Sequence, residues 1–235
     1  MTDMASIPSR AAQRMGGWSL IAAAVGFMAV FSYLAARFNY PDVLDGKAAD
    51  VLPNLLQLGE AGRAVWVVYA FLPMLLVPAG VGAYVLLREH APNAMRLAIV
   101  FSVLTAVSML IGLARWPSVH WELARAFATA SPDARVALAA VFDGLNTYLG
   151  NFIGEFLGEL SLNMFFLTTA FALLRAGRRR AAYAGITAAT IGLIAAFRNV
   201  TPVVSLAAEI NNYVLPLWLI GLGVVLLRFA RDHIS

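Results

Sequence analysis

Two glutamates four residues apart, Glu155 and Glu159, lie in an otherwise apolar stretch that is long enough to cross a membrane. A carboxylate near the centre of a bilayer costs about 2.5 to 3.5 kcal/mol on insertion scales, so such residues usually face protein or water and serve a function or a buried pair. A carboxyl group in this position can act as a general acid, pair with an arginine or hold a cation. No catalytic residue is assigned from the sequence, and Glu155 and Glu159 are the candidates.

The two glutamates belong to a regular pattern. Residues four apart lie on one face of a helix, because an α-helix has about 3.6 residues per turn. Glycines at this spacing let a neighbouring backbone approach closely. The sequence therefore predicts two adjacent stripes on one helix, which are a polar stripe of Asn151, Glu155, Glu159 and Asn163 and a packing stripe of Gly150, Gly154 and Gly158.

Nearby carboxylates repel each other, and the sequence leaves three forms of compensation open. The first, which we favour, is an ion-pair network with arginines at the ends of neighbouring helices. The second is a glutamate that stays protonated, and the third is a bridging divalent cation. The three histidines lack the His-x3-His and Glu-x-x-His spacings of helical metal sites, so we predict no metal and no cofactor. The polar cavity predicted in the outward half is lined by Arg115, Trp116, His120, Asp143, Asn151, Glu155, Glu159, Asn163, Arg198 and Glu209.

The composition shows which elements must position these residues. Of 235 residues, 61% are hydrophobic and 13% are charged, and the mean hydropathy is +0.76. Soluble domains contain about 25% charged residues, so this is an integral membrane protein. Six apolar stretches have about the 17 to 25 residues that a bilayer core requires, at 18–36, 64–87, 94–114, 152–174, 181–197 and 213–229. We predict an all-α fold, a polytopic bundle of six transmembrane helices in one domain over 1–235.

Long connections on one side add further helices to this bundle. A tail over 1–17 precedes the first span, and the outward loops are 38–63, 115–151 and 198–212. The first outward loop is expected to contain a short interfacial helix, and Ser131 is a helix N-cap before Pro132. One helix over 132–176 would be about 67 Å long, twice the hydrocarbon thickness, so we expect it to bend or break near Gly144 or Gly150.

The distribution of basic residues predicts the orientation. Ten arginines flank the span ends on the side of both termini, and seven basic residues lie on the other side together with ten of the thirteen acids. By the positive-inside rule, both termini are cytoplasmic. The net positive charge of the chain is thus explained by the arginines at the cytoplasmic ends of the spans, and no nucleic-acid partner is expected. The predicted location is the cytoplasmic (inner) membrane of a bacterium.

Two short motifs carry a resemblance to a known family. The stretch Gly112-Leu113-Ala114-Arg115-Trp116-Pro117, followed by Gly154-Glu155-Phe156-Leu157-Gly158, resembles a bacterial family of six-span membrane proteins known only as a domain of unknown function. Where the family often continues with a tryptophan-containing stretch, this sequence has Asn163-Met164-Phe165-Phe166. The resemblance covers most of the chain and implies no activity, but it draws attention to Arg115 and Glu155.

The sequence excludes several functions. The only lysine, Lys47, lies in a loop, which excludes a retinal Schiff base, and the chain has no cysteine and no motif of hydrolases, zinc proteases or nucleotidases. We expect a non-enzymatic binding, permeation or accessory role for a lipid or small amphiphile, with the bilayer and a second copy or another membrane protein as partners. The alternatives are an enzyme that uses Glu155 or Glu159 as general acid on a lipid or isoprenoid, and a proton- or cation-coupled transporter.

Overall fold

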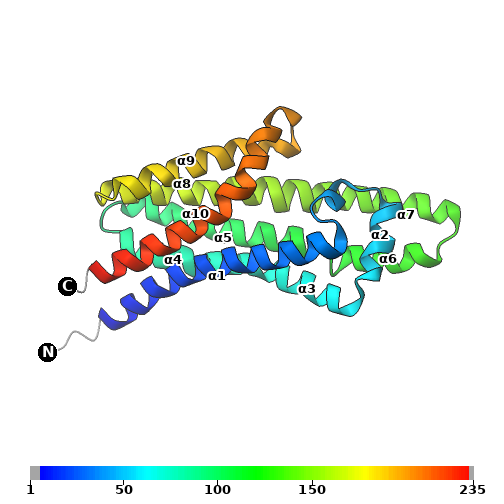
Figure 1. Ribbon diagram of the computed structural model, residues 1–235, viewed down its shortest axis with the longest axis horizontal. Coiled ribbons are helices and arrows are strands. Elements are labelled where there is room, and N and C mark those ends of the chain that lie inside the picture. Colours follow the sequence, from blue (N-terminus) through cyan, green and yellow to red (C-terminus); the bar gives the residue numbers. More distant parts are fainter. Residues whose placement is uncertain (1–5, 233–235) are drawn as a thin grey trace.

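Long apolar helices run side by side along most of the molecule (Figure 1). The computed structural model describes residues 6–232, and its regular structure there is entirely helical. The helices are α1 (Ser6–Phe38), α2 (Ala48–Gln57), α3 (Gly59–Phe71), α4 (Leu76–Leu87), α5 (Pro92–Ala114), α6 (Val119–Thr129), α7 (Pro132–Leu145), the π-helix η3 (Asn146–Leu157), α8 (Gly158–Arg175), α9 (Arg179–Ala196) and α10 (Ser205–Asp232). Short 3-10 turns occur at Asp42–Asp45, Leu72–Leu75, Phe197–Asn199 and Pro202–Val204.

The predicted all-α bundle with six membrane-length helices is confirmed. The spans are Arg14–Phe38, Gly59–Leu87, Pro92–Thr129, Pro132–Arg175, Arg179–Asn199 and Pro202–Ala230. Within the second span, the 3-10 turn Leu72–Leu75 separates α3 from α4. Pro73 lies in this turn and supplies no backbone donor, which accounts for the local change of helix type.

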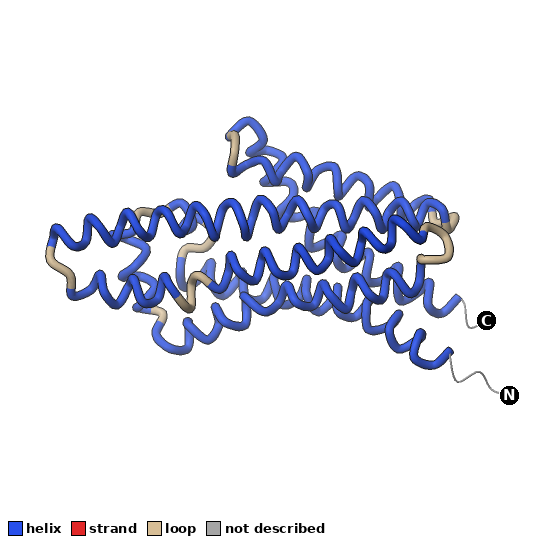
Figure 2. Tube along the Cα trace, turned by 180° about the vertical axis from the view of Figure 1, so that it is seen from behind, coloured by secondary structure: helices blue, strands red, loops and turns tan. Residues whose placement is uncertain are grey.

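The fourth span is longer than predicted, and it does not break. Residues Pro132–Arg175 form one continuous helical path through α7, η3 and α8 (Figure 2). At its start, the Ser131 hydroxyl accepts a hydrogen bond from the Ala134 amide at 3.4 Å. A bend or break was expected near Gly144 or Gly150; the chain does not break there, and Gly150 lies in twelve residues of π-helix, whose wider turns change the helical register without ending the helix. The helix can exceed the membrane thickness because other helices cover its far part.

These covering helices form a distal cap, which we define as α2, α6 and α7. The cap lies at the end of the bundle opposite both chain termini (Figure 1). Its core includes Leu52 and Leu55 of α2, Trp121 and Phe127 of α6, and Phe142 of α7. The predicted helix within 38–63 is α2, and it turns its apolar residues into this core instead of toward lipid.

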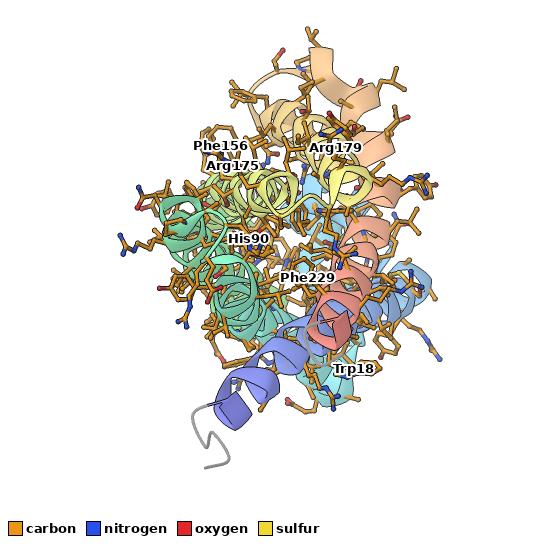
Figure 3. The ribbon with its side chains drawn as sticks, turned by 90° about the vertical axis from the view of Figure 1, so that its left-hand side faces the viewer. Trp18, His90, Phe156, Arg175, Arg179 and Phe229 are labelled. Carbon is orange, nitrogen blue, oxygen red and sulfur yellow. The ribbon has the colours of Figure 1, made fainter. Side chains whose placement is uncertain are left out.

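The opposite end of the bundle carries both termini and the short turns between α4 and α5 and between α8 and α9 (Figure 1). Figure 3 looks onto this end, where Arg175 and Arg179 flank the turn between α8 and α9. A second apolar core fills the bundle here and includes Leu20, Met95, Phe165 and Leu222. The side chains of Arg10 and Arg231, which contribute to the sequence-based orientation, lie outside the described residues.

Candidate functional site

The glycine stripe determines which helix packs against the candidate glutamates. Gly150, Gly154 and Gly158 all face α5, where they meet Arg115, Gly112 and Met109 respectively. A Cβ atom at position 154 would lie 2.8 Å from the Gly112 Cα atom and 3.2 Å from the Leu149 carbonyl oxygen, and both of these atoms are backbone. The backbones of η3 and α5 therefore approach as closely as they do only because neither residue has a side chain.

The polar stripe faces a different neighbour, the end of α9. Arg198 donates from Nη2 to Glu155 Oε2 at 2.9 Å and to Glu159 Oε1 at 2.7 Å, and from Nη1 to Glu159 Oε2 at 2.5 Å. Asn199 Nδ2 donates to Glu155 Oε2 at 3.1 Å and to the Asn151 carbonyl oxygen at 3.0 Å. We call Glu155, Glu159, Arg198 and Asn199 the carboxylate–arginine cluster. It links η3 and α8 to the end of α9.

The carboxylate–arginine cluster is accessible from outside the protein. The exposed fractions of the Glu155, Glu159 and Arg198 side chains are 22%, 13% and 30%. One guanidinium serves two carboxylates, so the cluster has a formal charge of −1 when both glutamates are ionised. It is therefore a partly exposed group of charges within membrane-length helices, and it is not a sealed ion pair.

Arg115 does not join this cluster. The residue is 3% exposed. Its guanidinium donates from Nε and Nη2 to Asn146 Oδ1, both at 3.1 Å, and from Nη1 to the Gly112 carbonyl oxygen at 2.5 Å. Asn146 in turn donates to the Leu44 carbonyl oxygen at 2.8 Å. Among the described residues, no carboxylate lies within ion-pair distance of Arg115. Arg115 thus connects α5, η3 and the segment before α2, and of these two arginines only Arg198 pairs with the glutamates.

An aromatic group surrounds Arg115 at the base of the distal cap. The guanidinium carbon lies 5.0 Å from the ring centroid of Trp116, on which Trp66 stacks at 5.0 Å with an interplanar angle of 18°. The His120 ring meets Trp116 edge-on at 4.9 Å. The ring nitrogens of Trp66, Trp116 and His120 are buried and make no hydrogen bond to any described residue.

Tyr40 extends the aromatic group near Arg115. It follows α1 and packs edge-on against Trp66 and Tyr69, with ring centroids 5.9 Å and 6.1 Å away. Burial raises the pKa of Tyr40 to about 12, and the negative charge of Glu155 acts in the same direction. Tyr40 therefore keeps its phenol proton at neutral pH.

The remaining predicted residues divide into two groups. Asn163 lies in α8 beside the cluster and donates to the Glu159 carbonyl oxygen at 2.8 Å. Asp143 in α7 and Glu209 in α10 are exposed and take no part in the cluster. Across residues 6–232, apart from side chains that the structure does not describe, no three His, Asp or Glu residues lie close enough together to hold a metal ion.

Two pockets on the described surface involve other residues. One is polar and lies between α1 and α2, and the other is an apolar groove among α5, α8 and α9. Neither includes Glu155 or Glu159 in its lining. Access to the carboxylate–arginine cluster is seen in the exposure of its side chains.

Sequence reasoning missed three residues that contact these polar and aromatic groups. Asn146 binds Arg115, Asn199 binds Glu155, and Tyr40 packs against Trp66 in the aromatic group near Arg115. Asn146 precedes Gly150 by four residues, so extending the glycine stripe backward by one step would have found it. Asn199 directly follows Arg198, but its role depends on the 3-10 turn that ends α9. Tyr40 has no sequence pattern that marks it.

Comparison with known proteins identifies a family whose function is unknown. The sequence model of a family described as "Domain of unknown function (DUF4386)" matches residues 15–223. This match confirms the resemblance to a family of unknown function. No curated protein and no solved structure matches the chain.

Proposed function

The chain belongs to the DUF4386 family, whose description names no activity, and we propose that it is a non-enzymatic membrane protein that binds the head group of a lipid or small amphiphile at the carboxylate–arginine cluster. The observation that carries this proposal is the partial exposure of Glu155, Glu159 and Arg198 within membrane-length helices. Hydrocarbon cannot solvate such side chains, so their exposed surface calls for a polar group in the bilayer.

The net charge of the carboxylate–arginine cluster indicates the charge of the head group that it would bind. Two carboxylates and one guanidinium leave one negative charge, which a cationic group offsets. A primary amine fits best, because an ammonium donates up to three hydrogen bonds and Glu155 and Glu159 supply acceptor oxygens. We therefore propose a single-chain or two-chain amphiphile with an amine head as the ligand.

The engagement of both glutamates favours binding over acid catalysis. Arg198 contacts three of the four carboxylate oxygens of Glu155 and Glu159. A general acid needs a carboxyl group that is free to approach the reacting atom of a substrate. The contacts of Arg198 instead hold the carboxylates in fixed positions, as a binding site for a charged group requires.

The proposed location is a bacterial inner membrane with both termini in the cytoplasm. Support comes from the arginines at the end that carries the termini, including Arg88, Arg96, Arg175 and Arg179, together with the positive-inside rule. In this orientation, the carboxylate–arginine cluster lies in the outward half of the protein and the distal cap lies outside the membrane.

The binding proposal is tested with matched amphiphiles. Full-length protein in mild detergent is titrated with hexadecylamine or with hexadecanol, which has the same chain and no charge, and bound ligand is counted by native mass spectrometry. We expect hexadecylamine to bind about tenfold more tightly than hexadecanol, the effect of one charge-assisted contact. The doubly substituted variant Glu155→Gln/Glu159→Gln should lose this difference.

The control is Glu209→Gln, which makes the same chemical change at an exposed glutamate outside the cluster. Its preference for hexadecylamine should match that of the unmodified protein. Because the double variant leaves Arg198 without a carboxylate, the single variant Glu155→Gln is measured as well; it keeps the bond to Glu159 and should show an intermediate loss. An amine preference that survives in the double variant refutes the proposal.

A further inference from the structure

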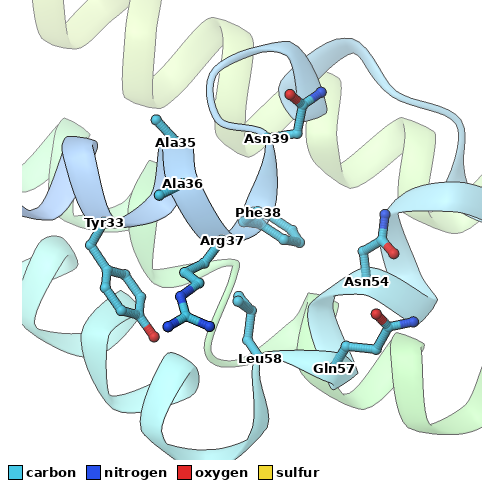
Figure 4. Close-up of a pocket in the computed structure, with 9 residues that line it drawn as sticks. All are labelled: Tyr33, Ala35, Ala36, Arg37, Phe38, Asn39, Asn54, Gln57 and Leu58. Atoms are coloured by element: carbon cyan, nitrogen blue, oxygen red, sulfur yellow. The ribbon is translucent and has the colours of Figure 1, made fainter.

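A polar pocket of about 460 Å³ opens between the end of α1 and α2 (Figure 4). Tyr33 and Arg37 come from α1, and Asn54 and Gln57 come from α2 on the opposite wall. Leu58 lies between the two walls in this view. The pocket is at the end of the bundle that carries the distal cap, away from both termini, and the carboxylate–arginine cluster contributes nothing to its lining.

The polar groups in the pocket have no partners within the protein. Tyr33, Arg37, Asn39, Asn54 and Gln57 are all exposed, and their side chains make no hydrogen bond or ion pair with any described residue. Five neighbouring polar side chains are thus free to bind a ligand from outside. Asn39, in the left-handed region with a φ of 53°, ends α1 and turns the chain over the pocket.

The charge of the pocket selects an anion. Of the described residues that line it, only Arg37 is charged, and no carboxylate is among them. A guanidinium presents a planar set of donors that matches two oxygens of a phosphate group, and the three carboxamides and the phenol add further donors. The lining therefore suits a group with several acceptor oxygens and a negative charge.

The position of the pocket along the membrane normal indicates where an anionic ligand would come from. The first span ends at Phe38, one residue after Arg37, so the pocket lies where the apolar part of α1 gives way to the polar layer. Ala35, Ala36 and Leu58 supply apolar surface beside the polar groups. A head group bound here would place its phosphate at Arg37 and its first carbons against these three residues.

We propose that this pocket binds a phosphate ester through Arg37, with Tyr33, Asn54 and Gln57 as additional hydrogen-bond donors. The site is independent of the amine site proposed above, because the two have opposite charge and share no residue. The shared chemistry of its ligands is the phosphate ester, carried either by a membrane lipid or by a soluble metabolite.

The test uses full-length protein in mild detergent and native mass spectrometry with hexadecyl phosphate, hexadecanol and glycerol phosphate as probes. We expect hexadecyl phosphate to bind about tenfold more tightly than hexadecanol, and Arg37→Gln to remove this difference. Arg125→Gln removes the same charge from an exposed arginine on α6 and should leave the preference unchanged. Asn54→Leu keeps the charge of the pocket and should weaken the preference in part.

Glycerol phosphate separates the two sources of the ligand. If it competes with hexadecyl phosphate in the unmodified protein and not in Arg37→Gln, the site takes soluble phosphate esters. If it does not compete while hexadecyl phosphate still depends on Arg37, the site takes a lipid head group. Equal binding of hexadecyl phosphate by Arg37→Gln and Arg125→Gln overturns the proposal, and this result is independent of the outcome for Glu155 and Glu159.

Discussion

At the scale of single residues, Arg198 holds the carboxylates together. Its guanidinium lies within 2.9 Å of both glutamates, while Arg115 binds Asn146 and a carbonyl oxygen. Arg198 therefore screens the repulsion between Glu155 and Glu159 and also joins α9 to α8. Without it, two acidic side chains that are mostly buried would have no cationic partner, a strongly unfavourable arrangement in a medium of low dielectric constant.

Replacement of Arg198 by glutamine should destabilise the protein by about 2 kcal/mol, between the small value of exposed ion pairs and the 3 to 5 kcal/mol lost when a buried pair is broken. The measurement is thermal unfolding in detergent at neutral pH. The matched control is Arg125→Gln, because Arg125 pairs with Glu122 at 3.5 Å and both side chains are more than 60% exposed.

The control should change the free energy of unfolding by less than about 1 kcal/mol. Combining Arg198→Gln with Glu159→Gln should recover part of the lost stability, since one unpaired carboxylate is then removed. Equal effects of Arg198→Gln and Arg125→Gln would show that the cluster contributes no more than a surface ion pair.

At the scale of elements, the contact between η3 and α5 depends on paired glycines. Gly154→Ala places a methyl group against the Gly112 backbone, which cannot move aside as a flexible side chain does. We expect a loss of about 1 to 3 kcal/mol, the usual effect of overpacking, measured by thermal unfolding in detergent.

Gly144 provides the control for this substitution. It lies in α7 of the same continuous helix, and a Cβ atom there would have no neighbour within 4 Å. Gly144→Ala should therefore stabilise the protein by about 0.5 to 1 kcal/mol through the better helix propensity of alanine. A stabilising effect of both substitutions would refute the close packing of η3 against α5.

The elements also show what the sequence could predict. The lengths of the apolar stretches were sufficient to predict six spans. The spacing of Gly150, Gly154 and Gly158 was sufficient to predict that they share one packing face. The π-helix was not predictable, because η3 is held by distant contacts such as the hydrogen bond from Asn146 to the Leu44 carbonyl oxygen. The choice of Arg198 over Arg115 was open for the same reason: it depends on which side of the helix each neighbour occupies.

At the scale of the whole molecule, the distal cap and the arginine-rich end lie at opposite ends of one bundle (Figure 1). The chain has no cysteine, so single cysteines can report the side of the membrane on which each end lies. We expect Val136→Cys, on α7 of the cap with 72% of its surface exposed, to react with a membrane-impermeant maleimide in sealed spheroplasts.

Glu89→Cys, in the turn between α4 and α5, is also exposed and should react only after the membrane is permeabilised. The two variants therefore control for each other within one labelling experiment. Labelling of Glu89→Cys in sealed spheroplasts, with protection of Val136→Cys, would reverse the proposed orientation.

The unbroken path through α7, η3 and α8 joins the distal cap to the membrane bundle through one continuous helix. Each residue of a helix turns the chain about the helix axis, so deleting one residue within the π-helix Asn146–Leu157 would rotate α7 by roughly a quarter-turn relative to α8. Phe142 would then leave the interior of the cap while Glu159 kept its place beside Arg198. A deletion or insertion in this segment therefore rotates the distal cap relative to the membrane bundle. Its effect on packing would be greatest in the cap, far from the altered position.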